Sequence, residues 1–309
     1  MGIMIKDLIE STDLISVSNS KHALPAKVED LTTLAEESVE QVALPIIDFS
    51  LLTSGSPDQR SKIVEELRNA CLHWGFFMVV NHGVPQSLKE ELINSCMNFF
   101  DLSLEEKSVY EGENASDPCI LDPIICGTNF NPASRSVSFW RDYLRVLVHP
   151  VFNSPVKPEA LSEGLREYSN RSREIMKELT RAIMEGLELE EENIEESLEL
   201  NSGVQKFSAN LYPPCPQPEL AIGLPPHADR GLLTLLIQND VGGLQIKNKG
   251  KWVAVNAIPN SIMVNIGDHM EILSNGKYKA VLHRAVVNNK ETRISLVMTN
   301  GPSTETYVT

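Results

Sequence analysis

The chain has 309 residues, of which 42% are hydrophobic and 22% are charged, a balance that predicts a globular protein with one large domain or two that share an interface. Its 42 acidic and 27 basic residues give a net charge of -15, the wrong sign for a protein that binds nucleic acid by neutralising phosphates. Five cysteines without a C-x-x-C pair argue against a disulfide framework or a structural zinc site, and the absence of a signal-like start or of a membrane-spanning apolar run predicts a cytoplasmic protein.

The N-terminal half is predicted to be an arm followed by a mixed region of helices and strands. Residues 1–43 are polar and acidic and predict a surface arm with a helix, and residues 44–150 predict the mixed region. In that region Ser56, Pro57 and Gln59 form a capping signal for a helix. Apolar periodicity then predicts, in order, a strand, a second helix, a long loop and another strand, over residues 76–80, 86–100, 111–136 and 139–148.

The C-terminal half changes from helices to strands. Residues 151–204 predict bracing helices, because apolar side chains recur every three or four positions between residues 159 and 186. Residues 205–309 instead contain short apolar strands separated by turns with Gly, Pro and Asn. A run of short strands at this spacing indicates a sandwich, a barrel or a jelly roll.

Three residues in this strand region can bind a metal ion. His227 and Asp229 stand two positions apart at the expected start of the strand LLTLLIQ, and because side chains alternate along a strand, both are expected on one face. His283 interrupts the apolar segment AVLHRAVV and is the expected third ligand. The alternative is that each histidine is a hydrogen-bonded core residue. Two histidines and one carboxylate form the facial set that is typical of non-haem iron(II) oxygenases.

A pair of residues suited to a carboxylate follows His283. The same alternation places Arg293 and Ser295 side by side on one face of the next strand. The planar arginine fork makes charge-assisted bonds to a carboxylate, and the serine hydroxyl adds a further donor. A buried arginine without an acidic neighbour in its own strand is costly, so the pair predicts an anionic ligand.

The segment NLYPPCPQPELAIGLPPHADRGLLTLLIQNDVGGLQI, together with HRAVV and the R-x-S motif after it, resembles the plant 2-oxoglutarate- and iron(II)-dependent dioxygenases of specialised metabolism. The segments LPIIDFS, ACLHWGFFMVVNHGV, FFDLSLEEK and WRDYL also resemble that family. The resemblance covers nearly the whole chain after residue 43. It implies a mainly β fold with flanking α-helices and a core that is a double-stranded β-helix, or jelly roll.

The resemblance also implies a function and roles for single residues. The implied ligands of Fe(II) are His227, Asp229 and His283. The implied contacts of 2-oxoglutarate are Arg293 and Ser295 at its distal carboxylate, with Tyr212 and Asn210 lining the same site; the alternative for Tyr212 is simple packing beside the following prolines. With O₂ as a second cosubstrate and ascorbate as an accessory reductant, such an enzyme releases succinate and CO₂. It hydroxylates, desaturates, demethylates or ring-closes its substrate.

The sequence predicts the substrate less closely than the reaction class. Positions that form the pocket walls in the family correspond here to Phe130, Phe139, Phe207 and Thr299. Their apolar character predicts a small, largely apolar plant metabolite, such as a neutral aromatic, a terpenoid or an alkaloid. We expect the protein to act on it as a monomer, without a nucleic-acid or membrane partner.

Two other functions fit parts of the pattern. One is a non-catalytic metal- or small-molecule-binding jelly-roll protein, against which the combination of triad and R-x-S argues. The other is an iron enzyme that oxidises an amino-acid-derived substrate with a different reductant, and release of succinate would distinguish it. Members of the family generally continue into a C-terminal segment over the active-site mouth, whereas this chain ends at Thr309 soon after the last predicted strand, so we expect this lid to be absent.

Overall fold

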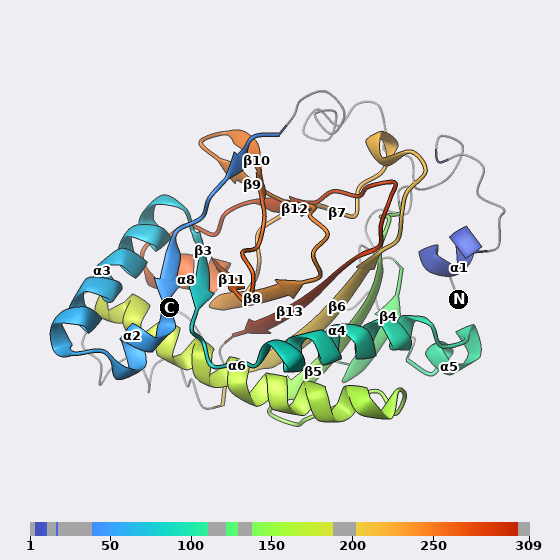
Figure 1. Ribbon diagram of the computed structural model, residues 1–309, viewed down its shortest axis with the longest axis horizontal. Coiled ribbons are helices and arrows are strands. Elements are labelled where there is room, and N and C mark those ends of the chain that lie inside the picture. The colour runs from blue at the N-terminus through green and yellow to red at the C-terminus, as the bar shows by residue number, and fades with distance from the viewer. Residues whose placement is uncertain are drawn as a thin grey trace.

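The computed structural model describes residues 4–10, 17, 39–110, 122–128, 138–187 and 202–301. The predictions for Phe130, for most of the loop over residues 111–136 and for a lid after Gly301 lie outside these residues. The described elements form two β-sheets and a group of helices (Figure 1).

The larger sheet has eight strands in the order β2-β3-β11-β8-β13-β6-β5-β4. Their bounds are β2 (Ile46–Asp48), β3 (Phe76–Val80), β4 (Ile124–Gly127), β5 (Asp142–His149), β6 (Gln205–Tyr212), β8 (Leu233–Gln238), β11 (Ile262–Ile266) and β13 (Arg293–Asn300). Strands from the regions predicted over residues 44–150 and 205–309 therefore share one sheet.

The smaller sheet has five strands in the order β1-β10-β9-β12-β7. Their bounds are β1 (Gln41–Val42), β7 (Leu224–His227), β9 (Leu244–Asn248), β10 (Lys251–Val255) and β12 (His283–Ala285). From β6 onward the chain passes repeatedly between the two sheets, as a double-stranded β-helix requires. The predicted mainly β fold with flanking helices is confirmed.

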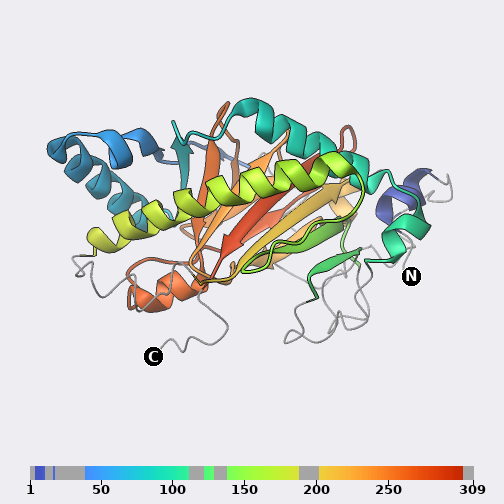
Figure 2. The same ribbon diagram turned by 90° about the horizontal axis from the view of Figure 1, so that it is seen from below.

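The helices gather mostly beside the larger sheet. They are α1 (Ile5–Glu10), α2 (Phe49–Ser54), α3 (Pro57–His73), α4 (Gln86–Phe100), α5 (Leu104–Ser108), α6 (Glu159–Glu185), α8 (Asp268–Leu273) and the 3₁₀ turn η2 (Pro218–Leu220). Figure 2 shows α4 and α6 crossing one side of the larger sheet. Among the described residues, no helix is both long enough and apolar enough to cross a membrane.

Local signals account for the helix bounds. The predicted capping box is present at the start of α3, where Ser56 and Gln59 satisfy each other's backbone N–H groups. The bounds predicted for the second helix are those of α4, and the predicted long helix is α6. Cys71 and Cys96 are buried in α3 and α4 and pack in the main core.

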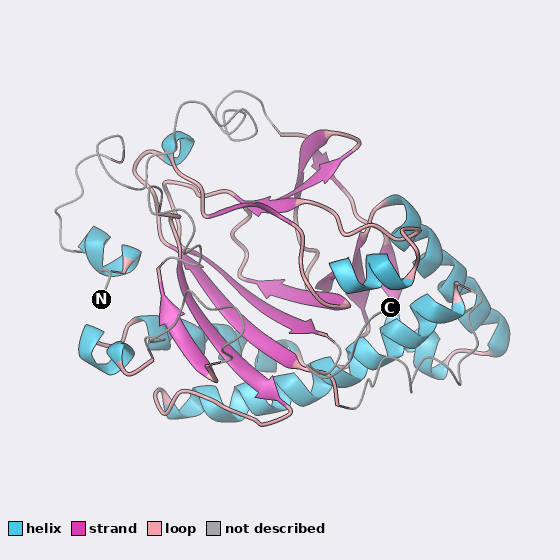
Figure 3. Ribbon diagram, turned by 180° about the vertical axis from the view of Figure 1, so that it is seen from behind, coloured by secondary structure: helices cyan, strands magenta, loops and turns pink. Residues whose placement is uncertain are grey.

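The two faces of the larger sheet have different roles. The outer face packs against α3, α4 and α6 and forms the main hydrophobic core, with residues such as Leu144, Leu211 and Leu296. The inner face looks toward the smaller sheet, on the side away from α4 and α6 (Figure 3). At one end of that face, Phe76 and Met263 join Ile246 of β9 in a second core cluster between the sheets.

The N-terminal helix is attached to the core and is not a surface arm in its described part. Met4 and Ile5 are buried. The buried carboxylate of Asp142, in β5, accepts hydrogen bonds from the backbone N–H groups of Ile5 (2.8 Å) and Lys6 (2.9 Å). The prediction of a surface arm was wrong here because the acceptor lies 137 residues away from Ile5 in the sequence.

Candidate metal centre

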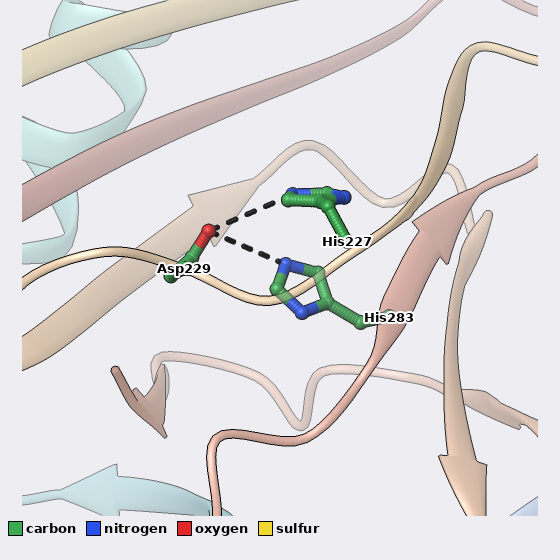
Figure 4. A group of neighbouring side chains, drawn as sticks. All are labelled: His227, Asp229 and His283. Atoms are coloured by element: carbon green, nitrogen blue, oxygen red, sulfur yellow. Dashed lines mark ion pairs between the residues drawn. The ribbon is translucent and has the colours of Figure 1, made fainter. Parts of the chain in front are cut away.

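His227, Asp229 and His283 lie together between the two sheets (Figure 4). The Nε2 atoms of both histidines are 3.6 Å from Asp229 Oδ1, and one possible ligand atom from each residue lies within 4.8 Å of the others. Among the described residues, no other group of three His, Cys, Asp or Glu side chains meets this criterion. This is the expected donor set for a divalent transition metal.

The route by which these residues meet differs from the sequence prediction. His227 is the last residue of β7, and Asp229 lies in the turn before β8 begins at Leu233. His283 is the first residue of β12 and the register partner of His227. The prediction that His227 and Asp229 open the strand LLTLLIQ was wrong, because the chain has to turn there from the smaller sheet to the larger one.

Backbone carbonyls fix the orientation of both imidazoles. His227 Nδ1 donates to the carbonyl oxygen of Pro225 at 2.8 Å, and His283 Nδ1 donates to that of Val281 at 3.1 Å. Because a carbonyl can only accept, each ring carries its proton on Nδ1. The Nε2 lone pairs are therefore free for a metal ion, the orientation that outer partners commonly impose on histidine ligands.

Asn265 holds the carboxylate. Its Nδ2 donates to Asp229 Oδ2 at 2.9 Å from the inner face of β11. This leaves Asp229 Oδ1 facing the two imidazoles. Asn265 was not predicted as a site residue, although a polar residue in the apolar strand SIMVNIG is a usable signal.

Burial and mutual charge set the protonation states. Burial, and then the neighbouring His283, lower the pKa of His227 to about 4. Burial alone raises the pKa of Asp229, but His283, His227 and the Asn265 hydrogen bond outweigh it and hold that pKa below its ordinary value. Near neutral pH the site thus offers a neutral His227 and an ionised carboxylate, which are the forms that bind metals.

Arg293 and Ser295 lie on the inner face of β13, as the alternation predicted. Arg293 is 2% exposed, and its Nη2 donates to Gln238 Oε1 at 2.8 Å. Its Nε and Nη1 are buried and have no hydrogen-bond partner in the described part of the chain. Gly243 makes room for this side chain, since a Cβ there would lie 2.9 Å from Arg293 Cδ. Two unpaired donors on a buried guanidinium fit a carboxylate ligand.

Tyr212 and Asn210 stand beside this pair on β6. Tyr212 is the register partner of Arg293, whose guanidinium carbon lies 5.0 Å from the centre of the tyrosine ring. Asn210 is the register partner of Ser295. Its Oδ1 accepts a hydrogen bond of 3.2 Å from Arg141 Nη1. No role was predicted for this buried arginine, although it belongs to the segment WRDYL.

The four residues predicted to line the substrate site have four different outcomes. Phe207 lies on the outer face of β6, fully buried in the helix-packed core, so its assignment to the substrate site was wrong. Thr299 is partly buried on the inner face of β13 and pairs with Thr234. Phe139 is partly buried just before β5. Phe130 lies outside the described residues.

The remaining histidines are not part of the metal group. His82 is buried, with its Nε2 2.9 Å from the carbonyl oxygen of Asn260, and burial lowers its pKa. His73, His149 and His269 belong to no such three-residue group within the described ranges.

Comparison with known proteins identifies the family. Residues 199–302 match the 2OG-Fe(II) oxygenase superfamily, and residues 44–168 match the family described as non-haem dioxygenase in morphine synthesis, N-terminal. The 2-oxoglutarate-dependent dioxygenase 19 of Oryza sativa subsp. japonica is 42% identical over 92% of this chain and 84% of its own length. Thebaine 6-O-demethylase of Papaver somniferum is 38% identical over 86% of this chain and 73% of its own length.

A solved structure agrees with these sequence matches. The structure of JOX2 in complex with 2OG, Fe and JA aligns with a TM-score of 0.83 at 29% identity, covering 99% of this chain and 85% of that one. These matches confirm the resemblance to plant dioxygenases and the jelly-roll core. The chain belongs to the 2OG-Fe(II) oxygenase superfamily and is a dioxygenase that uses iron(II) and 2-oxoglutarate.

Proposed function

We propose that His227, Asp229 and His283 hold the iron(II) of this dioxygenase, and that Arg293 and Ser295 bind the distal carboxylate of 2-oxoglutarate. The observation that carries the proposal is the convergence of the three metal-binding side chains between the sheets, with the unpaired buried donors of Arg293 on the same inner face. Asn210 and Tyr212 line the cosubstrate site beside Arg293.

Each residue has a defined task in this proposal. Bound iron(II) with 2-oxoglutarate supplies the oxidising chemistry that consumes O₂ and yields succinate and CO₂. His227 and His283 point Nε2 toward Asp229 because their Nδ1–H groups are held by backbone carbonyls. Arg293 provides charge-assisted hydrogen bonds in a buried setting, where such bonds are strong.

The substrate is a small organic molecule, and we propose a plant specialised metabolite that is hydroxylated, desaturated, demethylated or ring-closed. Similarity to a thebaine 6-O-demethylase supports this class. We further propose that the protein acts as a monomer and binds no nucleic acid, which its net charge of -15 supports. Ascorbate as an accessory reductant and a cytoplasmic location stay predictions.

Replacing Asp229 tests the iron site. We expect Asp229→Ala to weaken iron(II) binding by more than about 100-fold. Losing a residue that only hydrogen-bonds to a metal ligand already lowers metal affinity by up to about 100-fold, and Asp229 is itself a proposed ligand. The anaerobic protein should also lose the metal-to-ligand charge-transfer band that iron(II) and 2-oxoglutarate give together. Iron content and this band are measured on the same sample.

His82→Gln is the control, since His82 is buried but stands outside the metal group. We expect it to retain stoichiometric iron and the band. Stoichiometric iron in Asp229→Ala with normal succinate release would contradict the proposed ligands, and iron loss in His82→Gln would mean that the wrong histidines were chosen.

A further inference from the structure

A second buried arginine shares the inner face with the candidate metal centre. Arg141 immediately precedes β5 and is 4% exposed. Its Nη1 donates to Asn210 Oδ1, but its Nε and Nη2 are buried and have no hydrogen-bond partner among the described residues. A guanidinium in this state has lost its water without gaining an anion, which is costly unless a ligand compensates.

Arg141 stands beside the proposed cosubstrate site. Its Nη1 bonds to Asn210, which is the register partner of Ser295 on β13. Tyr212, two positions after Asn210 on the same face of β6, lies against Arg293, whose guanidinium carbon is 5.0 Å from the centre of the tyrosine ring. The hydrogen bond to Asn210 therefore puts Arg141 next to the residues proposed to bind 2-oxoglutarate.

No carboxylate among the described residues is available to neutralise Arg141. The one acidic residue that acts on its pKa is the adjacent Asp142. Side chains alternate along β5, and both carboxylate oxygens of Asp142 already accept the backbone N–H groups of Ile5 and Lys6. Asp142 thus serves the N-terminal helix on the other face of the strand.

Further cations lie along the same face. Arg145 is two residues after Tyr143 on β5, and Lys206 is on β6. Burial, and to a smaller extent Arg141, lower the pKa of Arg145 to about 10 against the opposing effect of Tyr143. Burial, then Arg145, lowers the pKa of Lys206. A chain with a net charge of -15 thus places several cationic side chains along one face of β5 and β6.

We propose that Arg141 binds a carboxylate of the organic substrate, so that the substrate class is a small organic acid. The inference rests on the proposed function, in which Arg293 takes the distal carboxylate of 2-oxoglutarate. Arg141 then orients the second reactant by a charge-assisted bond from its free Nε and Nη2 atoms. This replaces the expectation of a neutral, largely apolar substrate, which came from phenylalanine positions that do not all face the site.

The test compares an acid with its neutral isostere. Benzoate and benzamide are titrated by calorimetry into the anaerobic protein loaded with iron(II) and 2-oxoglutarate. We expect the parent to bind benzoate at least roughly tenfold more tightly than benzamide, the scale of one hydrogen bond to a charged group. Arg141→Met should remove that preference, and Arg141→Lys should retain part of it. Arg68→Met is the control, because it makes the same charge change on the exposed side of α3, and it should bind both compounds as the parent does.

Two results overturn the proposal. One is that the parent binds benzoate no more tightly than benzamide, or binds neither. The other is that Arg141→Met keeps the preference of the parent for benzoate. A weakened 2-oxoglutarate affinity in Arg141→Met with an intact benzoate preference also overturns it, because Arg141 then belongs to the cosubstrate site. If Arg141→Met does not fold, Arg141→Lys and the parent ratio decide. The charge-transfer band of the parent reports separately on the proposed function, so failure of either idea is recognised independently.

Discussion

The two faces of the larger sheet are built from the same strands but from opposite kinds of residue. Along β6, Phe207, Ala209 and Leu211 face the helices and belong to the main core. The alternate residues Asn210 and Tyr212 face inward, beside Arg293 and Arg141. Because neighbouring residues of a strand point to opposite sides, one segment supplies stability on one face and binding chemistry on the other.

Buried charged side chains on the two faces also differ in their hydrogen bonding. On the outer face, Asp142 is buried with both oxygens hydrogen-bonded. On the inner face, Arg141 and Arg293 are buried with unpaired nitrogen atoms. Buried charged groups are costly unless they are paired, so the contrast is the one expected between a structural carboxylate and two arginines that we propose to bind ligands. Substitutions on the outer face should therefore change stability, and substitutions on the inner face should change binding.

Truncation of an outer-face side chain gives the largest expected effect. Phe207→Ala should destabilise the protein by about 3–5 kcal/mol, the usual cost of removing a fully buried phenylalanine. Affinity for iron(II) and for 2-oxoglutarate should stay as in the parent. Urea unfolding and the charge-transfer titration measure the two quantities. Unchanged stability with impaired binding of small ligands would restore Phe207 to the substrate site and would break the distinction between the faces.

The inner-face counterpart is Arg293. Arg293→Lys keeps the charge but loses the planar fork, so binding of 2-oxoglutarate should weaken by roughly 1.5–3 kcal/mol, the scale of a hydrogen bond to a charged group. Iron affinity should barely change, since the proposed ligands are elsewhere. A titration of the anaerobic iron(II) protein, with an iron assay of the same sample, measures both. Parent-like affinity for 2-oxoglutarate would remove the main physical support for the role of Arg293.

The sequence predicted most of what depends on local pattern. The bounds of α4, the cap of α3 and the shared face of Arg293 and Ser295 all follow from periodicity and capping. Strand periodicity also argues against the prediction for Phe207. Phe207 and Asn210 are three positions apart on one strand, so their side chains cannot share a face. Thr299, an even number of positions from Arg293, does lie on the inner face.

What the sequence could not give depends on contacts between distant segments. Asp229 reaches the histidines from a turn, and the register between β7 and β12 that joins His227 to His283 is a tertiary feature. The role of Asn265 requires knowing that β11 lies beside β8 in the sheet. Likewise, Arg141 becomes a candidate binding residue only when the structure shows it buried beside Asn210 with two nitrogen atoms unpaired.

Asn265 offers the smallest and most selective change on the inner face, because it touches the metal group through one hydrogen bond only. Asn265→Ala removes the 2.9 Å bond to Asp229 Oδ2, which frees the carboxylate to rotate away from the two imidazoles. We expect iron(II) affinity to fall by about 10–100-fold, the usual effect of losing an outer partner of a ligand. The same bond helps to lower the pKa of Asp229. In the variant, protons therefore compete with iron at a higher pH, and the loss of iron(II) affinity relative to the parent grows as the pH falls.

The measurement is iron(II) affinity across a pH series, with Asn69→Ala on the exposed side of α3 as the matched control. An affinity equal to that of the parent at every pH would mean that the turn alone holds Asp229 in place, and that the inner face of β11 does not contribute to the metal site.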